Sequence, residues 1–255
     1  MQVAVILRLV PDTGEELEIG ETGLDIDREW IGIKLSEFDD QALEEAVLLK
    51  ERSGVTVTAI ALGGDGADRM LQTAIARGAD KVLRIDHDIE DTRDSARLAS
   101  VYSDAVRQIG ADLVLTGVMT PEDTLGQLAG SLAGKLGWPA FNAVTSVSAA
   151  DGGVHVRQEY SGGRAAVFAV SGPAVIGVQS ASQAPRYVAG SKLRQAAGTP
   201  IAAQTIASSV PATEARFTAL KPVETSGQAT AIEGDAKAIA TQIVGLLSGK
   251  GLIGA

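Results

Sequence analysis

Cysteine is absent from the sequence, and this absence excludes several kinds of site at once. Disulfides, thiolate metal sites, iron–sulfur clusters and thiol nucleophiles all need cysteine. Histidine is nearly absent as well, with 2 residues in a chain of 255. His87 lies in an acidic stretch and His155 on an alternating one, so we expect both at the surface and no metal site.

Positive charge is also scarce. The chain has 22 Lys and Arg residues against 32 Asp and Glu residues, which gives a formal net charge of −10 at pH 7. Nucleic acids and anionic membrane surfaces bind proteins through clustered Lys and Arg. The sequence therefore argues against both as partners, and a hydrophobic content of 45% is typical of an ordinary soluble, folded protein.

Long hydrophobic runs are missing. The apolar run at the N-terminus is short and is followed by Pro11 and Asp12, unlike a secretory signal peptide. Residues 165–185 carry no charge, but Gly172, Pro173 and several serines interrupt them. This pattern indicates two buried strands joined by a turn rather than a membrane span. We expect a cytoplasmic protein that does not insert into a membrane.

The N-terminal half alternates buried strands with amphipathic helices. The expected strands cover residues 2–10, 55–62, 81–86 and 111–117. The expected helices cover residues 38–53, 67–77, 93–109 and 125–136. Such alternation predicts right-handed βαβ units, and hence one doubly wound, mainly parallel α/β sheet.

The pattern changes after Pro139. Gly-Gly pairs at 152–153 and 162–163 separate alternating runs, which predicts hairpins that extend the sheet with antiparallel strands. From about residue 190 to 233 the chain is rich in Ala, Ser, Thr and Pro and has little periodicity, so we expect an extended arm. A final helix follows, whose aligned apolar residues are Ile239, Ile243, Val244 and Leu247.

These patterns divide the chain into two parts. Residues 1–189 are expected to form an α/β nucleotide-binding domain, and residues 190–255 an extended C-terminal arm and helix. An arm of this kind cannot bury its own apolar residues. We therefore expect it to wrap another polypeptide.

Ligands of open parallel sheets bind beyond the carboxyl ends of the strands, where the strand order reverses. Three loops should converge there, with the sequences RLVPDT, LGGDG and GVMTPEDTLGQ. In the third loop we expect free backbone N–H groups near a helix start, which suit a phosphate, at Thr124, Gly126 and Gln127. Alternatively these are ordinary strand-to-helix turns, since they match neither the Walker loop nor the G-x-G-x-x-G fingerprint.

No catalytic set of residues is recognisable. Ser36 and Asp39 have the spacing of a helix-capping box as much as that of a ligand site. Glu44 and Glu45 are neighbours on an expected helix, and we expect them to form a solvated face.

Several stretches together resemble the electron-transfer flavoprotein β subunit in their order and spacing. The resemblance covers roughly residues 1–200 and rests on VILRLVPDT, KLSEFDDQALEEAVLLK, ARGADKVLRID, ADLVLTGVMT, LAGKLGWPAFNAV, VRQEYSGGR and SGPAVIGVQSASQAPRY. It implies a heterodimer with a larger α subunit that carries the redox-active FAD. It also implies that the β subunit binds a structural AMP or, in electron-bifurcating members, a second FAD. The chain would then be an electron carrier, not an enzyme.

Two departures from the family concern the nucleotide. The family's Asn-Pro-Phe-Asp-Glu reads Ser-Glu-Phe-Asp-Asp at 36–40, and Ser36 cannot read a base edge bidentately as Asn would. Phe38 is retained and would lie near the flavin of the α subunit. The phosphate loop is shorter than in the family. The resemblance places the nucleotide near Ile6, Arg8, Ser36, Gly63, Asp123, Thr124, Gly126 and Gln127.

A third departure concerns the electron donor. After Pro-Arg-Tyr the family presents a Leu-Pro that docks on acyl-CoA dehydrogenases, whereas this chain continues from Tyr187 to Gly190 and Leu193. These three residues mark the partner-recognition position of the family. Because the leucine anchor is missing there, we expect poor electron exchange with a generic acyl-CoA dehydrogenase and a dedicated dehydrogenase that uses a different surface.

Two other functions stay open on the same fold. A non-redox module that senses AMP or ATP would need only the nucleotide site. An adenylate-forming enzyme is less favoured, because the sequence has no recognisable ATP-pyrophosphatase phosphate loop.

Overall fold

The computed structural model describes residues 1–87, 93–123, 125–201, 203–206, 217–223, 227 and 229–253. The chain divides into two units, Met1–Ala219 and Leu220–Ala255. The strands of the large sheet in the first unit are β1 (Gln2–Ile6), β4 (Thr56–Leu62), β5 (Lys81–Asp86), β6 (Leu113–Gly117), β7 (Ala140–Ala150), β8 (Gly153–Tyr160), β9 (Arg164–Val170), β10 (Ala174–Val178) and β11 (Ala203–Thr205).

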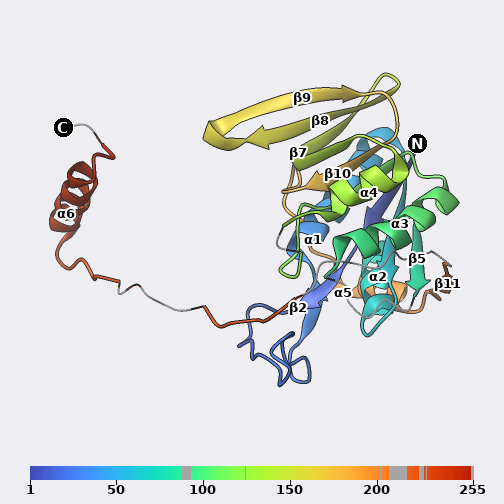
Figure 1. Cartoon of the computed structure of the whole chain (residues 1–255). Helices are drawn as coiled ribbons and strands as arrows, with labels where there is room; N and C mark the ends of the chain where they lie inside the picture. Colours follow the sequence, from blue (N-terminus) through green and yellow to red (C-terminus); the bar gives the residue numbers. More distant parts are fainter. Residues whose placement is uncertain are drawn as a thin grey trace. The chain divides into compact units, whose positions relative to one another are not determined.

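These nine strands lie in the order β11-β5-β4-β1-β6-β10-β7-β8-β9 (Figure 1). The pairs from β11 to β7 are parallel, and the two pairs that involve β8 are antiparallel. This confirms the prediction of a mainly parallel sheet with an antiparallel extension. A separate antiparallel ribbon pairs β2 (Leu9–Pro11) with β3 (Ile33–Leu35).

Helices cover both faces of the sheet. They are α1 (Glu37–Ser53), α2 (Ala67–Arg77), α3 (Ser95–Ile109), α4 (Leu128–Leu136) and α5 (Gly190–Ala197), with a short 3-10 turn, η1 (Ser161–Gly163). Alternate residues of β1 face opposite cores: Val3 and Val5 pack with α1 and α2, whereas Ala4 and Ile6 pack with α3 and α4. The sheet is therefore doubly wound, as predicted.

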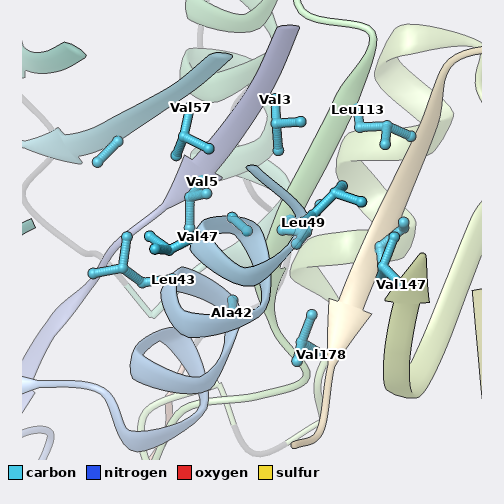
Figure 2. Close-up of a cluster of buried hydrophobic side chains, with 14 of the residues drawn as sticks. Val3, Val5, Ala42, Leu43, Val47, Leu49, Val57, Leu113, Val147 and Val178 are labelled. Atoms are coloured by element: carbon cyan, nitrogen blue, oxygen red, sulfur yellow. The ribbon is translucent and has the colours of Figure 1, made fainter. Parts of the chain in front are cut away.

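The core under α1 is formed by side chains of neighbouring strands and by one face of the helix. Val3 of β1 lies opposite Val57 on one neighbouring strand and Leu113 on the other. Leu43 and Val47, one turn apart on α1, belong to the same buried cluster and lie beside Val5 of β1 (Figure 2). Burying a Val or Leu side chain contributes roughly 1.5–3 kcal/mol, so this continuous layer is a main source of stability.

Residues 190–206 are not an extended arm, which corrects that part of the prediction. Residues 190–197 form α5, and Gln72 of α2 donates hydrogen bonds to the carbonyl oxygens of Ala197 (3.0 Å) and Thr199 (3.2 Å). The next segment adds β11 to the free edge of β5, where unpaired backbone groups accept a further strand. The first unit consequently extends to Ala219, beyond the boundary expected at residue 189.

The expectation that Glu44 and Glu45 form a solvated face is wrong. Their exposed fractions are 2% and 0%. Glu45 accepts hydrogen bonds from the amides of Val147 (2.6 Å) and Ser182 (2.7 Å), and Glu44 pairs with Arg186. Donors from β7 and from the segment after β10 lie on this side of α1, and they satisfy the carboxylates that burial would otherwise penalise.

The second unit contains one helix among its described residues, α6 (Ala236–Gly249). The side chain of Asp235 caps it by accepting a hydrogen bond from the amide of Ala238 (2.8 Å). This confirms the helix expected near the C-terminus. Among the described helices of either unit, none is both long and apolar enough to cross a membrane.

Candidate functional site

The strand order reverses at β1, because β4 and β5 extend the sheet on one side and β6 on the other. A cavity of about 130 Å³ lies at the carboxyl ends of β1 and β4 and beside the loop after β6. This is where open parallel sheets hold ligands. Its lining residues are Leu7, Arg8, Leu9, Val10, Leu62, Gly63, Gly64, Asp65, Leu98, Tyr102, Thr120 and Glu122.

Arg8 and Asp39 form a buried ion pair at the floor of this region. The guanidinium meets the carboxylate with two hydrogen bonds, Nε to Oδ2 and Nη2 to Oδ1, both 2.8 Å. Asp39 is fully buried and Arg8 is 7% exposed. Burial lowers the pKa of Arg8, but the adjacent Asp39 carboxylate outweighs it, and the net pKa is raised. Arg8 therefore stays a fixed cation beside the cavity.

Gly117 at the end of β6 allows this pair to form. A Cβ atom at this position would lie 2.6 Å from the backbone nitrogen of Asp39 and 2.6 Å from the carbonyl carbon of Phe38. Without a side chain, the strand end approaches α1 closely enough for the Gly117 amide to donate to Oδ1 of Asp39 (2.7 Å). Asp39 is thus held by Arg8, Gly117 and the Arg8 amide together. It does not take part in the capping box considered from the sequence.

Asp123 occupies the N-terminal end of α4, where a phosphate was expected. Its carboxylate accepts hydrogen bonds from the amides of Gln127 and Leu128 (both 3.3 Å), and its carbonyl oxygen accepts one from Gly126 (3.1 Å). The N–H groups of Gly126 and Gln127 are therefore engaged within the loop, not free as predicted. Thr124, the third residue of that set, lies outside the described residues.

The loop between β4 and α2 differs from the loop before α4 in its backbone N–H groups. No described residue accepts a hydrogen bond from the amides of Gly64, Asp65 or Gly66, which precede the first turn of α2. Gly63 and Gly64 line the cavity itself. Free amides at a helix start suit an anionic group. The loop LGGDG thus offers donors that the loop before α4 has already used.

Tyr102 closes the cavity from α3. Burial raises the pKa of its hydroxyl, more than the nearby Arg8 guanidinium lowers it, so the phenol is neutral at physiological pH. The spacing of Tyr102 on an apolar helical face predicts a core residue. No signal in the sequence marks it as part of a cavity wall.

The structure brings some of the predicted nucleotide residues together and separates others. Arg8 and Gly63 line the cavity, and Asp123 lies beside it, 3.8 Å from Nη1 of Arg8. Ile6 faces away into the core under α3. Ser36 is buried at the start of α1, and its hydroxyl has no hydrogen-bond partner. Phe38 lies in the first turn of α1 and is partly buried.

The residues expected to recognise a donor follow a rigid anchor. Arg186 donates to Glu44 through its amide (3.0 Å) and its Nε (2.9 Å), and its guanidinium also pairs with Glu51. Burial raises the pKa of Glu44, but hydrogen bonds from Arg186 outweigh it and lower the pKa overall. Tyr187, the next residue, is 92% exposed. Gly190 and Leu193 lie on α5.

No group of His, Asp and Glu side chains in the described part of the chain could hold a metal ion. His155 is exposed, as expected, whereas His87 is partly buried. The geometry therefore describes a cavity with one fixed cation and a row of free amides.

Residues 24–210 match the family model of the electron transfer flavoprotein domain, which is most of the chain. The chain belongs to the electron transfer flavoprotein family. It is similar to the electron transfer flavoprotein subunit beta of Methylophilus methylotrophus, with 29% identity over 79% of this chain and 78% of that one. The subunit beta of Syntrophomonas wolfei is 28% identical over 95% of this chain and 94% of its own. That of Bacillus subtilis is 34% identical over 58% and 57%.

Family membership confirms that the chain is part of an electron carrier and not a substrate-transforming enzyme. The family match includes both cavity loops, LGGDG and the loop before α4.

Proposed function

We propose that the chain is the β subunit of a heterodimeric electron-transfer flavoprotein, which shuttles electrons between a dehydrogenase and an acceptor in the cytoplasm. The single observation that carries this proposal is the family match over residues 24–210. The similar proteins named subunit beta support it, since they align over most of their own length in two of the three cases above.

The α subunit is the proposed partner, and it carries the redox-active FAD. Within its own unit α6 has no other described helix or strand to pack on. A lone helix of 14 residues is marginally stable in water, and this one is rich in apolar residues. Packing against another polypeptide would stabilise α6. We place that contact on the α subunit. Separately, Phe38 in the first turn of α1 is proposed to lie near the flavin of that subunit.

A nucleotide, AMP or a second FAD, is the proposed ligand of the cavity. Its position at the switch point, the Arg8 cation and the free amides of Gly64 to Gly66 support binding there. The start of α4 does not fit a phosphate in this arrangement, because the Asp123 carboxylate lies there and already accepts hydrogen bonds from the amides of Gln127 and Leu128. The cavity of about 130 Å³ is also below the roughly 300 Å³ at which ligand pockets begin. Binding a whole nucleotide therefore requires the loop before α4 to open.

The donor is proposed to be a dedicated dehydrogenase, and not a generic acyl-CoA dehydrogenase, which would dock at Tyr187, Gly190 and Leu193; the dedicated donor would use a different surface. Tyr187 is exposed beside a fixed anchor, and Gly190 offers no side chain for an acyl-CoA dehydrogenase pocket.

Co-expression with a candidate α subunit of the same family tests the proposal. We expect a stable complex with the visible spectrum of bound flavin, and AMP or FAD released on heating in addition to the FAD of the α subunit. A chain that binds adenine nucleotide but never associates with a flavin-carrying subunit would support the sensing module instead.

A further inference from the structure

The segment that links β2 to β3 holds most of the net negative charge of the protein. Figure 1 shows this blue segment looping out beyond β2. Between residues 12 and 29 there are eight carboxylates and a single cation, Arg28, which leaves seven of the ten net charges in this short stretch. The carboxylates are Asp12, Glu15, Glu16, Glu18, Glu21, Asp25, Asp27 and Glu29.

This segment is an ordered ribbon. Ile19 and Ile26 form an antiparallel bridge, and the Asp27 amide donates to the carbonyl oxygen of Glu18 (2.9 Å). The Gly32 amide donates to the Glu15 carboxylate (2.9 Å) and ties the end of the ribbon to its start. A preformed surface loses little conformational entropy when a partner binds.

The cations of this region are directed away from most of its carboxylates. Arg28 pairs with Asp25 (3.2 Å) and with Glu122 of the loop after β6. Lys34 pairs with Asp12 (2.9 Å). Glu16, Glu18 and Asp27 have no cationic partner among the described residues. Their charges therefore face solvent without internal neutralisation.

These unneutralised carboxylates border a groove of about 420 Å³ with an indole in its wall. Trp30 is 83% exposed, although a large aromatic side chain normally gains by burial. Tryptophan is enriched at binding hot spots and is the best ring for cation–π contacts. The groove is lined by Glu15, Glu16, Glu18, Asp27, Trp30 and Ile31.

The negative charge and the exposed indole of the groove indicate what kind of partner can bind there. The carboxylates of the described residues do not converge tightly enough to hold a metal ion, and nucleic acid would be repelled. A purely apolar segment would desolvate the carboxylates without pairing them. A chain of Lys and Arg side chains pairs the spread carboxylates and places one cation over the exposed indole.

We propose that this groove, which we call the Trp30 groove, docks a Lys/Arg-rich segment of a partner protein. One cation of that segment lies against Trp30, and its neighbours pair with Glu16, Glu18 and Asp27. Complementary charge of this kind mainly speeds association and selects the partner. The inference concerns a surface separate from the nucleotide cavity, so it does not depend on electron transfer.

A fluorescein-labelled oligo-arginine peptide is the probe, and its anisotropy is measured with the full chain, alone and in complex with the α subunit. We expect W30A, and separately E16Q/E18Q/D27N, to weaken binding about tenfold or more, as expected for the loss of a cation–π contact or of charge pairing. The matched control D68N/D112N/D151N removes the same charge from exposed positions of the first unit that do not line the groove. It should weaken binding by less than about threefold.

Two results would overturn the proposal: equal losses in the groove and control triple variants, or a W30A variant that binds like the wild type. Both would mean that the peptide senses only net charge. Binding by the free chain but not by the complex would support the proposal and identify the α subunit as the source of the basic segment. Because the readout is peptide binding, a negative result leaves the proposed electron carrier intact.

Discussion

The guanidinium of Arg8 donates two hydrogen bonds of 2.8 Å to the carboxylate of Asp39. Both side chains are buried where β1 and α1 meet the end of β6. The pair joins a strand end to a helix start and sets the floor of the cavity. Removing one partner of a buried ion pair leaves an uncompensated buried charge. This destabilises the fold far more than replacing both partners with apolar residues.

Asp39→Asn should therefore lower the free energy of unfolding by about 3–5 kcal/mol, because Arg8 keeps its charge without a counterion. Urea denaturation followed by circular dichroism measures this. Asp104→Asn is the control: it removes an exposed carboxylate that pairs with Arg107 on α3, and it should change stability by less than about 1 kcal/mol. Similar small effects in both variants would show that Arg8 finds another partner.

Asp123→Asn tests whether the Asp123 carboxylate excludes phosphate. The variant removes the negative charge and leaves one oxygen for the amides of Gln127 and Leu128. We expect AMP to bind about tenfold more tightly by calorimetry, with a stability loss of roughly 0.5–2 kcal/mol from the weakened helix cap. Asp151→Asn, a charge removal in a distant turn, should leave AMP binding unchanged. Weaker AMP binding to Asp123→Asn would mean that Asp123 is a ligand and not a barrier.

Glu44 should make stability depend on acidity. Its pKa in the folded chain lies below the ordinary 4.5, mainly through Arg186, so its stabilising contribution is fully present above that value. The contribution is lost as the pH falls through the lowered pKa. The difference in unfolding free energy between wild type and Glu44→Gln should be constant near neutral pH and shrink in acid. Glu159→Gln, at an exposed ion pair, should show a much smaller pH-dependent difference. If the difference in unfolding free energy between the wild type and Glu44→Gln stays the same in acid, the pKa of Glu44 does not differ between the folded and unfolded chain.

Gly190→Leu tests the docking of donors. The position is exposed at the first turn of α5, and an added Cβ meets only Arg194 Nη1, at 3.5 Å. Leu is also about 1 kcal/mol better than Gly in a helix, so folding should not suffer. If a leucine anchor is what this surface lacks, a medium-chain acyl-CoA dehydrogenase should reduce the variant complex roughly ten- to a hundredfold faster at low concentration. Rapid reduction of the native complex, unimproved by the substitution, would contradict the proposed docking surface.

The sheet and most helices follow from the sequence because burial on both faces leaves a plain pattern: apolar runs for strands and a repeat near 3.6 for helices. α5 and β11 were missed because they are short, with 8 and 3 residues. Contacts with α2 and with the open edge of β5 hold them in place. Leu125, the first residue of the helix expected over 125–136, is instead 78% exposed, because α4 starts only at Leu128.

The site was less predictable than the fold. The position of the cavity follows from the reversal of strand order at β1, and Arg8 and Gly63 were predicted to lie at it. The partners of the charged residues were not predictable, because they are far apart in the chain. Asp39 reaches Arg8 across 31 positions, and Arg186 reaches Glu44 across 142. Periodicity predicts which face of a helix a residue lies on. It does not predict whether that face contacts solvent or a counterion from a loop that is distant in the sequence.

The most direct test of the account is an anaerobic redox titration of this chain purified with its α subunit. We predict one stable complex whose flavin absorbance bleaches stepwise with dithionite and returns on addition of an electron acceptor. The α subunit prepared without this chain should lose its flavin or fail to exchange electrons. A flavin that titrates identically with and without this chain, or a chain that never joins the α subunit, would contradict the assignment as the β subunit of an electron carrier.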